Sequence, residues 1–274
     1  MHWSWGALRR TRRDVATRAT WDPGQYLRWG EHRLRPAVDL LQRVPLTDPR
    51  HVVDLGCGTG NVTALMRRMW PQARVTGVDG SPAMLERARV SDAGVDWQQA
   101  DIARWKPDAP VDVLFSNAAL HWLDDHGTLL PRLLDIVAPG GVLAVQMPRN
   151  FGEPSHTTIV DVVQEGAWRD RLAPLCRREP CRAPAYYWDL LAPRAAALDI
   201  WETVYQQALT GDNPVADFVK GSWLKQFLDA LEPSERGAFE AAYRAKVVRA
   251  YEPRADGTTL FPFRRLFIVA RCAP

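Results

Sequence analysis

The sequence predicts an α/β protein with a mostly parallel, twisted sheet whose last strand is antiparallel, plus an inserted helical cap. Between residues 50 and 147, short apolar runs alternate with segments whose apolar residues recur at helical spacing. A mostly helical stretch follows, and the chain returns to a strand-like run, RRLFIVAR, at residues 264–271. Because the first strands are apolar throughout, we expect helices on both faces of the sheet.

Five strands and three helices are expected before the cap. The second helix begins at Ser81-Pro82, because serine caps helix starts and proline is favoured at the first helical position. The third is expected to end at Pro139-Gly140-Gly141. In order, the predicted elements are strand 51–55, helix 61–69, strand 74–79, helix 82–90, strands 95–101 and 111–117, helix 125–141 and strand 142–148.

Four segments are expected along the chain. Residues 1–20 form a basic extension that we expect to be disordered, and residues 21–150 form a Rossmann-like core. Residues 151–250 form the helical cap, with one strand-like run at 198–209. Residues 251–274 supply the C-terminal strand that completes the core sheet.

Charge and composition narrow the classes of partner. The 274 residues carry a net charge of +3, of which the arginine-rich residues 1–20 contribute +4. The remainder is near neutral, so nothing demands a nucleic acid. No run approaches the roughly 20 apolar residues of a membrane helix. Four cysteines in a chain of this length form neither a disulfide framework nor a zinc site. We expect a soluble, cytoplasmic protein without a metal, either a monomer or a homodimer.

The stretch HVVDLGCGTGN, residues 51–61, places a glycine-rich loop at the carboxyl end of the first strand. In such sheets ligands bind beyond the carboxyl ends of the strands. A dinucleotide site needs Gly-x-Gly-x-x-Gly, but counting from Gly56 the third position is Asn61. The glycines lie at Gly56, Gly58 and Gly60, and Asp54 precedes them. An acid here suits a ligand with an ammonium group better than a pyrophosphate.

Two further acids follow the next strands in order. Asp79 ends the second strand, where it can accept both hydroxyls of a ribose, and Asp101 follows the third, where an adenine amino group would lie. Met84 and Ile102 can flank the ring. One aspartate at a strand end is often a turn residue, but three in order describe an adenosine joined to an amino acid. The sequence therefore predicts S-adenosylmethionine as the cofactor.

The chain resembles the trans-aconitate 2-methyltransferase family of class I S-adenosylmethionine-dependent methyltransferases over about residues 21–271. The glycine loop is typical of the whole superfamily. More specific are NAALHWL, AVQMP, AYY and RLFIVAR. The departures are the basic start and the pair Arg264-Arg265 after Pro262-Phe263.

The resemblance implies a set of cofactor-binding residues. Tyr26 belongs to the stretch WDPGQYL, which is expected to close over the cofactor. Asn117 follows the fourth strand. The complete expected set is Tyr26, Asp54, Gly56, Gly58, Gly60, Asp79, Gly80, Ser81, Met84, Asp101, Ile102 and Asn117.

The resemblance implies that the substrate is trans-aconitate or a related small polycarboxylate. Its carboxylates are ionised at neutral pH, so methylation needs positioning rather than a general base. Arginine forks bind carboxylates in bidentate fashion. We expect Arg149 and Arg265 to bind the substrate, with Arg264 as a weaker candidate, and Tyr186 and Tyr187 to donate hydroxyls from the cap.

Three functions remain open from the sequence. The first is O-methylation of a carboxylate, in which His121 only positions the substrate. The second is methylation of another small acid or of a hydroxyl group, with His121 as general base. The third is a cofactor-binding module without turnover. Methylation of nucleic-acid or protein amines is disfavoured, because Asn117 is followed by Ala-Ala-Leu and not by Pro-Pro-Tyr.

Overall fold

The computed structural model describes residues 34–91, 94–176 and 180–274. The predictions for residues 1–20 and for Tyr26 lie outside these ranges. The described chain forms a seven-stranded sheet with the order β3-β2-β1-β4-β5-β7-β6. β1 to β5 pair in parallel, and β7 runs antiparallel to both β5 and β6. The predicted fold class, with an antiparallel last strand, is confirmed.

The strands are β1 (His51–Leu55), β2 (Arg74–Asp79), β3 (Asp96–Gln99), β4 (Val111–Asn117), β5 (Val137–Pro148), β6 (Ala197–Leu209) and β7 (Thr259–Arg271). The helices beside the sheet are α2 (Arg35–Leu41), α3 (Asn61–Met69), α4 (Pro82–Ser91), the 3₁₀ helix η1 (Leu120–Trp122), α5 (His126–Asp135) and α8 (Pro184–Leu191). The cap contains α6 (Pro154–Glu165), α7 (Arg169–Leu172), the 3₁₀ helix η2 (Ala173–Leu175), α9 (Pro214–Lys220), α10 (Lys225–Asp229) and α11 (Pro233–Ala250).

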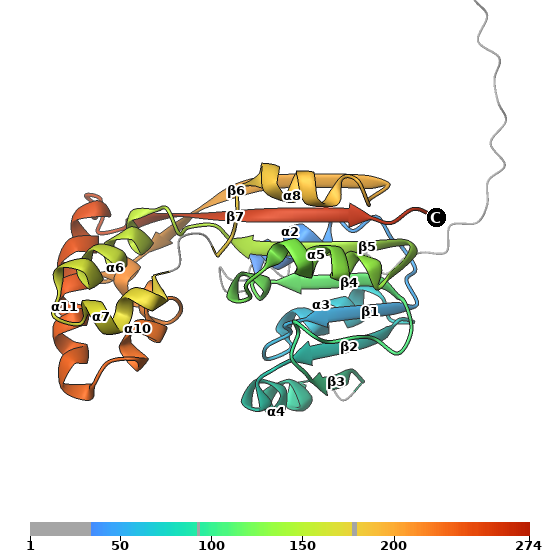
Figure 1. Ribbon diagram of the computed structural model, residues 1–274, viewed down its shortest axis with the longest axis horizontal. Helices are drawn as coiled ribbons and strands as arrows, with labels where there is room; N and C mark the ends of the chain where they lie inside the picture. Colours follow the sequence, from blue (N-terminus) through green and yellow to red (C-terminus); the bar gives the residue numbers. More distant parts are fainter. Residues whose placement is uncertain (1–33, 92–93, 177–179) are drawn as a thin grey trace, which may run out of the picture.

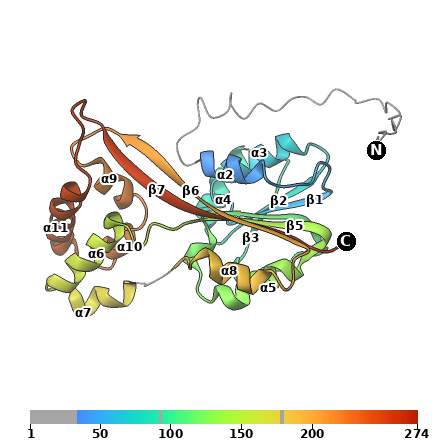
Figure 2. The same ribbon diagram turned by 90° about the horizontal axis from the view of Figure 1, so that it is seen from above.

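Helices cover the two faces of the sheet in two separate layers (Figure 2). α2 and α3 pack on one face, called here the α2 face, and α5 and α8 pack on the other, the α8 face. Because side chains alternate along a strand, neighbours divide between these cores. On β4, for example, Val113 and Phe115 face α2, whereas Leu114 faces α5.

Several predicted boundaries were wrong, most clearly around the third helix. That helix ends at Asp135 and not at residue 141, and β5 already begins at Val137. Val137 pairs with Val111 but Val142 pairs with Val113, so the intervening Pro-Gly-Gly forms an irregularity within the strand. The third strand spans only residues 96–99, and the last one begins five residues before the predicted start.

The cap lies beyond the carboxyl ends of the parallel strands (Figure 1). The long β6–β7 ribbon reaches into it, and Phe261 and Phe263 of β7 join the apolar core of its helices. The interval 151–250 is therefore not wholly cap, because β6 within it is the edge strand of the main sheet. A second connection is aromatic: Trp223 of the cap stacks on Trp122, with ring centroids 5.1 Å apart. In the described ranges, no helix is both long enough and apolar enough to cross a membrane.

Candidate functional site

The loop after β1 has the left-handed backbone that its glycines allow. Gly56, Gly58 and Gly60 have φ values of 83°, 54° and 80°. A Cβ at Gly56 would lie 2.2 Å from the Ala119 Cβ, and one at Gly60 would lie 2.6 Å from the ring of Trp97. At Gly58, by contrast, no atom of the described residues, apart from its two chain neighbours, lies within 4 Å of such a Cβ. The outer glycines thus permit close packing, while the middle one faces open space.

Asp79 connects this loop to the next strand end. Its Oδ2 accepts a hydrogen bond from the Gly58 amide at 2.9 Å, and its Oδ1 accepts one from the Ser81 amide at 2.8 Å. A carboxylate oxygen has more than one acceptor site, so both oxygens remain able to accept hydroxyl groups. Gly80 is exposed beside it, and Met84 on α4 is 40% exposed.

Asp54 lies beneath the loop and is only 2% exposed. Its Oδ2 accepts a hydrogen bond of 2.6 Å from the Thr63 hydroxyl, a partner that the sequence analysis missed. Burial raises the pKa of Asp54 to about 7; the Asp79 charge also raises it, and the Thr63 hydrogen bond opposes both effects. A buried carboxylate of this kind favours a neighbouring cation.

Asp101 and Ile102 lie next to the glycine loop in different ways. The Ile102 Cδ1 is 3.7 Å from where a Cβ at Gly56 would be, so this side chain borders the loop. The Asp101 side chain is 58% exposed, accepts a hydrogen bond from the Ala103 amide at 2.9 Å, and lies 3.8 Å from the Arg104 Nε. Asp101 therefore lies at the exposed rim.

A row of polar residues lies on the α2 face at the carboxyl edge of the sheet. On each of four strands, the residue two positions away belongs to the α2 core, so the polar side chain points to the same face. The four residues are Asp54, Asn117, Gln146 and Arg265. Asn117 pairs directly with Gln146. The Asn117 Oδ1 is buried without a hydrogen-bond partner among the described residues. The next residue, Ala118, has φ +53°, a strained conformation of the kind that clusters at ligand sites.

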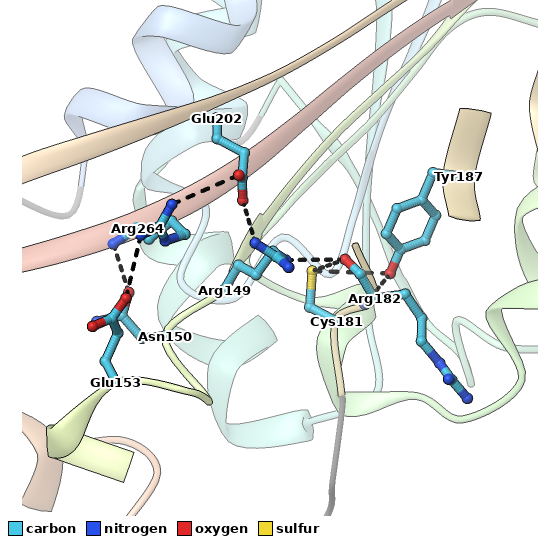
Figure 3. Close-up of polar contacts among 8 residues, drawn as sticks. All are labelled: Arg149, Asn150, Glu153, Cys181, Arg182, Tyr187, Glu202 and Arg264. Carbon is cyan, nitrogen blue, oxygen red and sulfur yellow. Dashed lines mark hydrogen bonds and ion pairs between the residues drawn. The ribbon is translucent and has the colours of Figure 1, made fainter. Parts of the chain in front are cut away.

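A chain of ion pairs occupies the opposite, α8 face (Figure 3). The Arg149 Nη1 lies 2.8 Å from Glu202 Oε1, and its Nε donates to the Arg182 carbonyl at 3.2 Å. The Arg264 guanidinium lies 3.7 Å from Glu202 and 3.4 Å from Glu153. Glu153 begins the cap and Glu202 belongs to β6. This network therefore connects cap and core, and in it Arg149, a predicted substrate-binding residue, is paired with the Glu202 carboxylate.

Tyr187, a predicted substrate-binding residue, belongs to α8 and is fully buried. Its hydroxyl lies 2.7 Å from His126 Nδ1 and accepts a hydrogen bond of 3.0 Å from the Arg182 amide. Burial raises its pKa above the ordinary value. The adjacent Tyr186 is 37% exposed, with the Arg182 guanidinium 5.6 Å from its ring centre.

His121 lies in an aromatic cluster between the core and the cap. It is 5% exposed, and its ring centre is 4.9 Å from Trp122 and 6.3 Å from Phe151. Phe151 in turn contacts Trp223, at 4.8 Å between ring centres. The position is compatible with shaping or positioning a substrate at this junction.

The described residues contain no candidate metal site, and a hollow on their surface lies away from the glycine loop. No group of three or more histidine, cysteine, aspartate or glutamate side chains could hold a metal ion there. A surface hollow of about 580 Å³, lined partly by Pro107, Arg194 and Cys272, lies near the amino-terminal ends of β4 and β5. It is at the opposite edge of the sheet from the glycine loop.

Solved structures share this architecture at low sequence identity. The Bacillus subtilis YcgJ protein superposes with a TM-score of 0.55 at 14% identity, over 88% of this chain and 99% of that one. Phosphoethanolamine N-methyltransferase 2 of Haemonchus contortus, solved with S-adenosyl-L-methionine, gives 0.51 at 17% identity, over 88% of this chain and 52% of that one. These likenesses establish the fold.

Sequence comparisons are far closer. A family model described as a methyltransferase domain matches residues 52–141. The trans-aconitate 2-methyltransferase of Azoarcus sp. is 51% identical over 251 residues, covering 92% of this chain and 98% of that protein. Its counterpart in Rhodopseudomonas palustris is 47% identical over 92% of this chain and 99% of that protein, and the Streptomyces coelicolor one is 47% identical over 93% and 88%. The chain belongs to the trans-aconitate 2-methyltransferase family.

Proposed function

We propose that the protein methylates a carboxylate of trans-aconitate or of a closely related small polycarboxylate, using S-adenosylmethionine. Support for the reaction comes from relatives bearing that name at 46–51% identity over 92–93% of the chain. The observation that carries the substrate class is Arg265. Arg265 is 6% exposed and lies on the same face of the sheet as Asp54 and Asn117. It is at the edge of the sheet where the glycine loop also lies.

The residues at the strand ends fit the parts of this cofactor. The space above Gly58 lets a ligand approach the backbone, and Asp79 retains acceptor capacity for ribose hydroxyls. The Asp54 carboxylate and the orphaned Asn117 Oδ1 both suit an ammonium group. Gly56, Gly60, Gly80, Ser81, Met84, Asp101, Ile102 and, outside the described residues, Tyr26 complete the proposed set.

S-adenosylmethionine supplies an electrophilic methyl group on a sulfonium. The protein's own contribution is to hold an ionised carboxylate in line with that group and to exclude water, which requires no proton transfer. Arg265 holds the anion, and the aromatic cluster around His121 shapes the site between core and cap. We assign His121 a positioning role, Arg149 and Tyr187 structural roles, and the exposed Tyr186 a contact at the rim of the site.

Methyl transfer to trans-aconitate tests the function itself. With methyl-tritiated S-adenosylmethionine, the purified protein is expected to label trans-aconitate in a product that loses its tritium on mild alkaline hydrolysis, as an ester does. A panel of di- and tricarboxylates and phenols serves as the comparison. Base-stable label on a phenol, lost in His121→Ala, would contradict carboxylate methylation, and binding of the cofactor without any transfer would leave only a binding module.

Two arginines on opposite faces of the sheet provide a matched pair. We expect Arg265→Met to raise the KM for trans-aconitate at least about tenfold, because a charge-assisted contact to the anion is lost. Arg149→Met should change KM less than about threefold and only weaken the pairing with Glu202, which is partly exposed. Steady-state kinetics on both variants shows which arginine affects the KM for trans-aconitate. S-adenosylhomocysteine binding is the control for folding. Equal KM values for Arg265→Met and the wild type would refute the assignment.

The raised pKa of Asp54 predicts a pH dependence of cofactor binding. A cation beside Asp54 favours the carboxylate, so binding releases its proton and strengthens as pH rises through about 7. S-adenosylhomocysteine should bind roughly eightfold more weakly at pH 6 than at pH 7.5. The stability of the free protein has the opposite pH dependence to cofactor binding. Its free energy of unfolding falls from about pH 4 to 7, because the folded state retains a proton on Asp54 that the unfolded state releases.

Calorimetric titrations at both pH values test this dependence. Asp54→Asn cannot ionise, so its weaker binding should not vary over the same range. A variant that keeps the wild-type pH dependence would place the titrating group elsewhere.

A further inference from the structure

Gln146 is the one amide side chain in the apolar strand β5, and only one of its two polar atoms has a hydrogen-bond partner among the described residues. Its side chain is completely buried. Its Oε1 accepts a hydrogen bond from Arg265 Nη1 at 3.3 Å, while its Nε2 has no hydrogen-bond partner among the described residues. Buried polar groups are nearly always paired in native proteins. An unused buried donor beside an arginine therefore calls for a ligand that accepts.

The orientation of this amide follows from its neighbour. A guanidinium only donates, so the amide oxygen must be the atom that faces Arg265. Rotating the amide by 180° would oppose two donors and lose the observed bond. The Nε2 is consequently the donor without a hydrogen-bond partner among the described residues.

The position of Gln146 connects the two halves of the proposed site. In the sheet register it lies directly beside Asn117 on β4, and on the other side its β7 neighbour is Phe267, two residues from Arg265. The preceding residue on the same face is the buried Ala144, which offers no side-chain acceptor, and the Oδ1 of the neighbouring Asn117 makes no hydrogen bond with the Gln146 Nε2. The amide thus lies between the proposed cofactor residue Asn117 and the proposed anion-binding Arg265.

We infer that Gln146 is a substrate-binding residue whose Nε2 donates to a carboxylate oxygen of the acceptor, next to Arg265. A carboxylate has only acceptors and can satisfy two donors at once, whereas a hydroxyl suits such a pair less well. A carboxylate whose lone pairs are held by two donors is a weak nucleophile. This one is therefore the anchoring carboxylate, and a second carboxylate receives the methyl group. The inference rests on the proposed function, because it needs a polycarboxylate acceptor.

Gln146→Met removes the amide at nearly constant volume, and Gln207→Met is its matched control. Gln207 is also a buried glutamine of the sheet with an unpartnered atom, but it lies on β6 beside Phe261, within reach of the cap core. We expect Gln146→Met to raise the KM for trans-aconitate about tenfold or more. Its melting temperature and its affinity for S-adenosylhomocysteine should stay at wild-type values, and Gln207→Met should leave the KM unchanged.

A substrate with one carboxylate fewer separates anchoring from general damage. If Gln146 holds the anchoring group, this analogue reacts poorly with the wild type and is not impaired further by Gln146→Met. Should Gln146→Met fold badly, Gln146→Glu keeps the shape and replaces the donor by an acceptor, and it should weaken anion binding still more.

The outcomes distinguish the anchoring role of Gln146 from the proposed function as a polycarboxylate methyltransferase. A wild type that methylates trans-aconitate together with a Gln146→Met variant of equal KM overturns this inference alone. The same holds if both acids lose activity in parallel with a lower melting temperature, which indicates a structural role. A wild type that methylates no polycarboxylate overturns the proposed function, and the anchoring role with it.

Discussion

The site depends on the left-handed loop between β1 and α3. Hydrogen bonds from the Gly56 and Cys57 amides to the Val78 carbonyl, at 2.7 and 3.0 Å, hold this loop against β2. That attachment forces the chain to pass close to Ala119, and only glycine fits there. The same path leaves space above Gly58 among the described residues, and it places the Gly58 amide where it donates a hydrogen bond to Asp79. This one backbone path thus brings the glycine loop and the acid at the end of β2 together.

The two faces of the sheet divide the polar residues by task. Adjacent residues on a strand point to opposite faces, so Arg264 and Arg265 have different surroundings although they are neighbours in sequence. Arg264 belongs to the ion pairs that join α6, β5, β6 and β7 on the α8 face (Figure 3). Arg265 is buried with Gln146 on the α2 face. One face thus stabilises the attachment of the cap, and the other is available to a ligand.

The parallel half of the fold could be predicted because its signals are local. Mostly apolar runs predicted strands at 51–55, 74–79 and 111–117, and the ends of all three match the structure. The Pro-Gly-Gly of residues 139–141 led to a wrong prediction of the helix end, because the same residues that stop helices also occur at irregularities in strands. Position in the sheet was not predictable for the 198–209 run, since its partner β7 lies about 60 residues away along the chain.

The site could be predicted in part. The spacing of the strand-end acids places them on one edge, which the sequence indicates directly. The arginines were harder to assign: whether Arg149 is paired depends on Glu202, 53 residues away, and on how the cap folds back. Gln146 did leave a signal, because it is the single polar residue in VLAVQM. That signal has meaning only once the register places Asn117 beside it.

Binding of S-adenosylhomocysteine to Gly58→Val, measured by calorimetry, tests the central claim most directly. The substitution adds a side chain where the described residues leave open space, so among these residues it causes no clash and costs the free protein the strain of the positive φ. We expect one site per chain in the wild type and at least about a tenfold loss of affinity in a variant that still folds. Wild-type affinity in a folded Gly58→Val variant would show that the cofactor does not occupy the space above this loop.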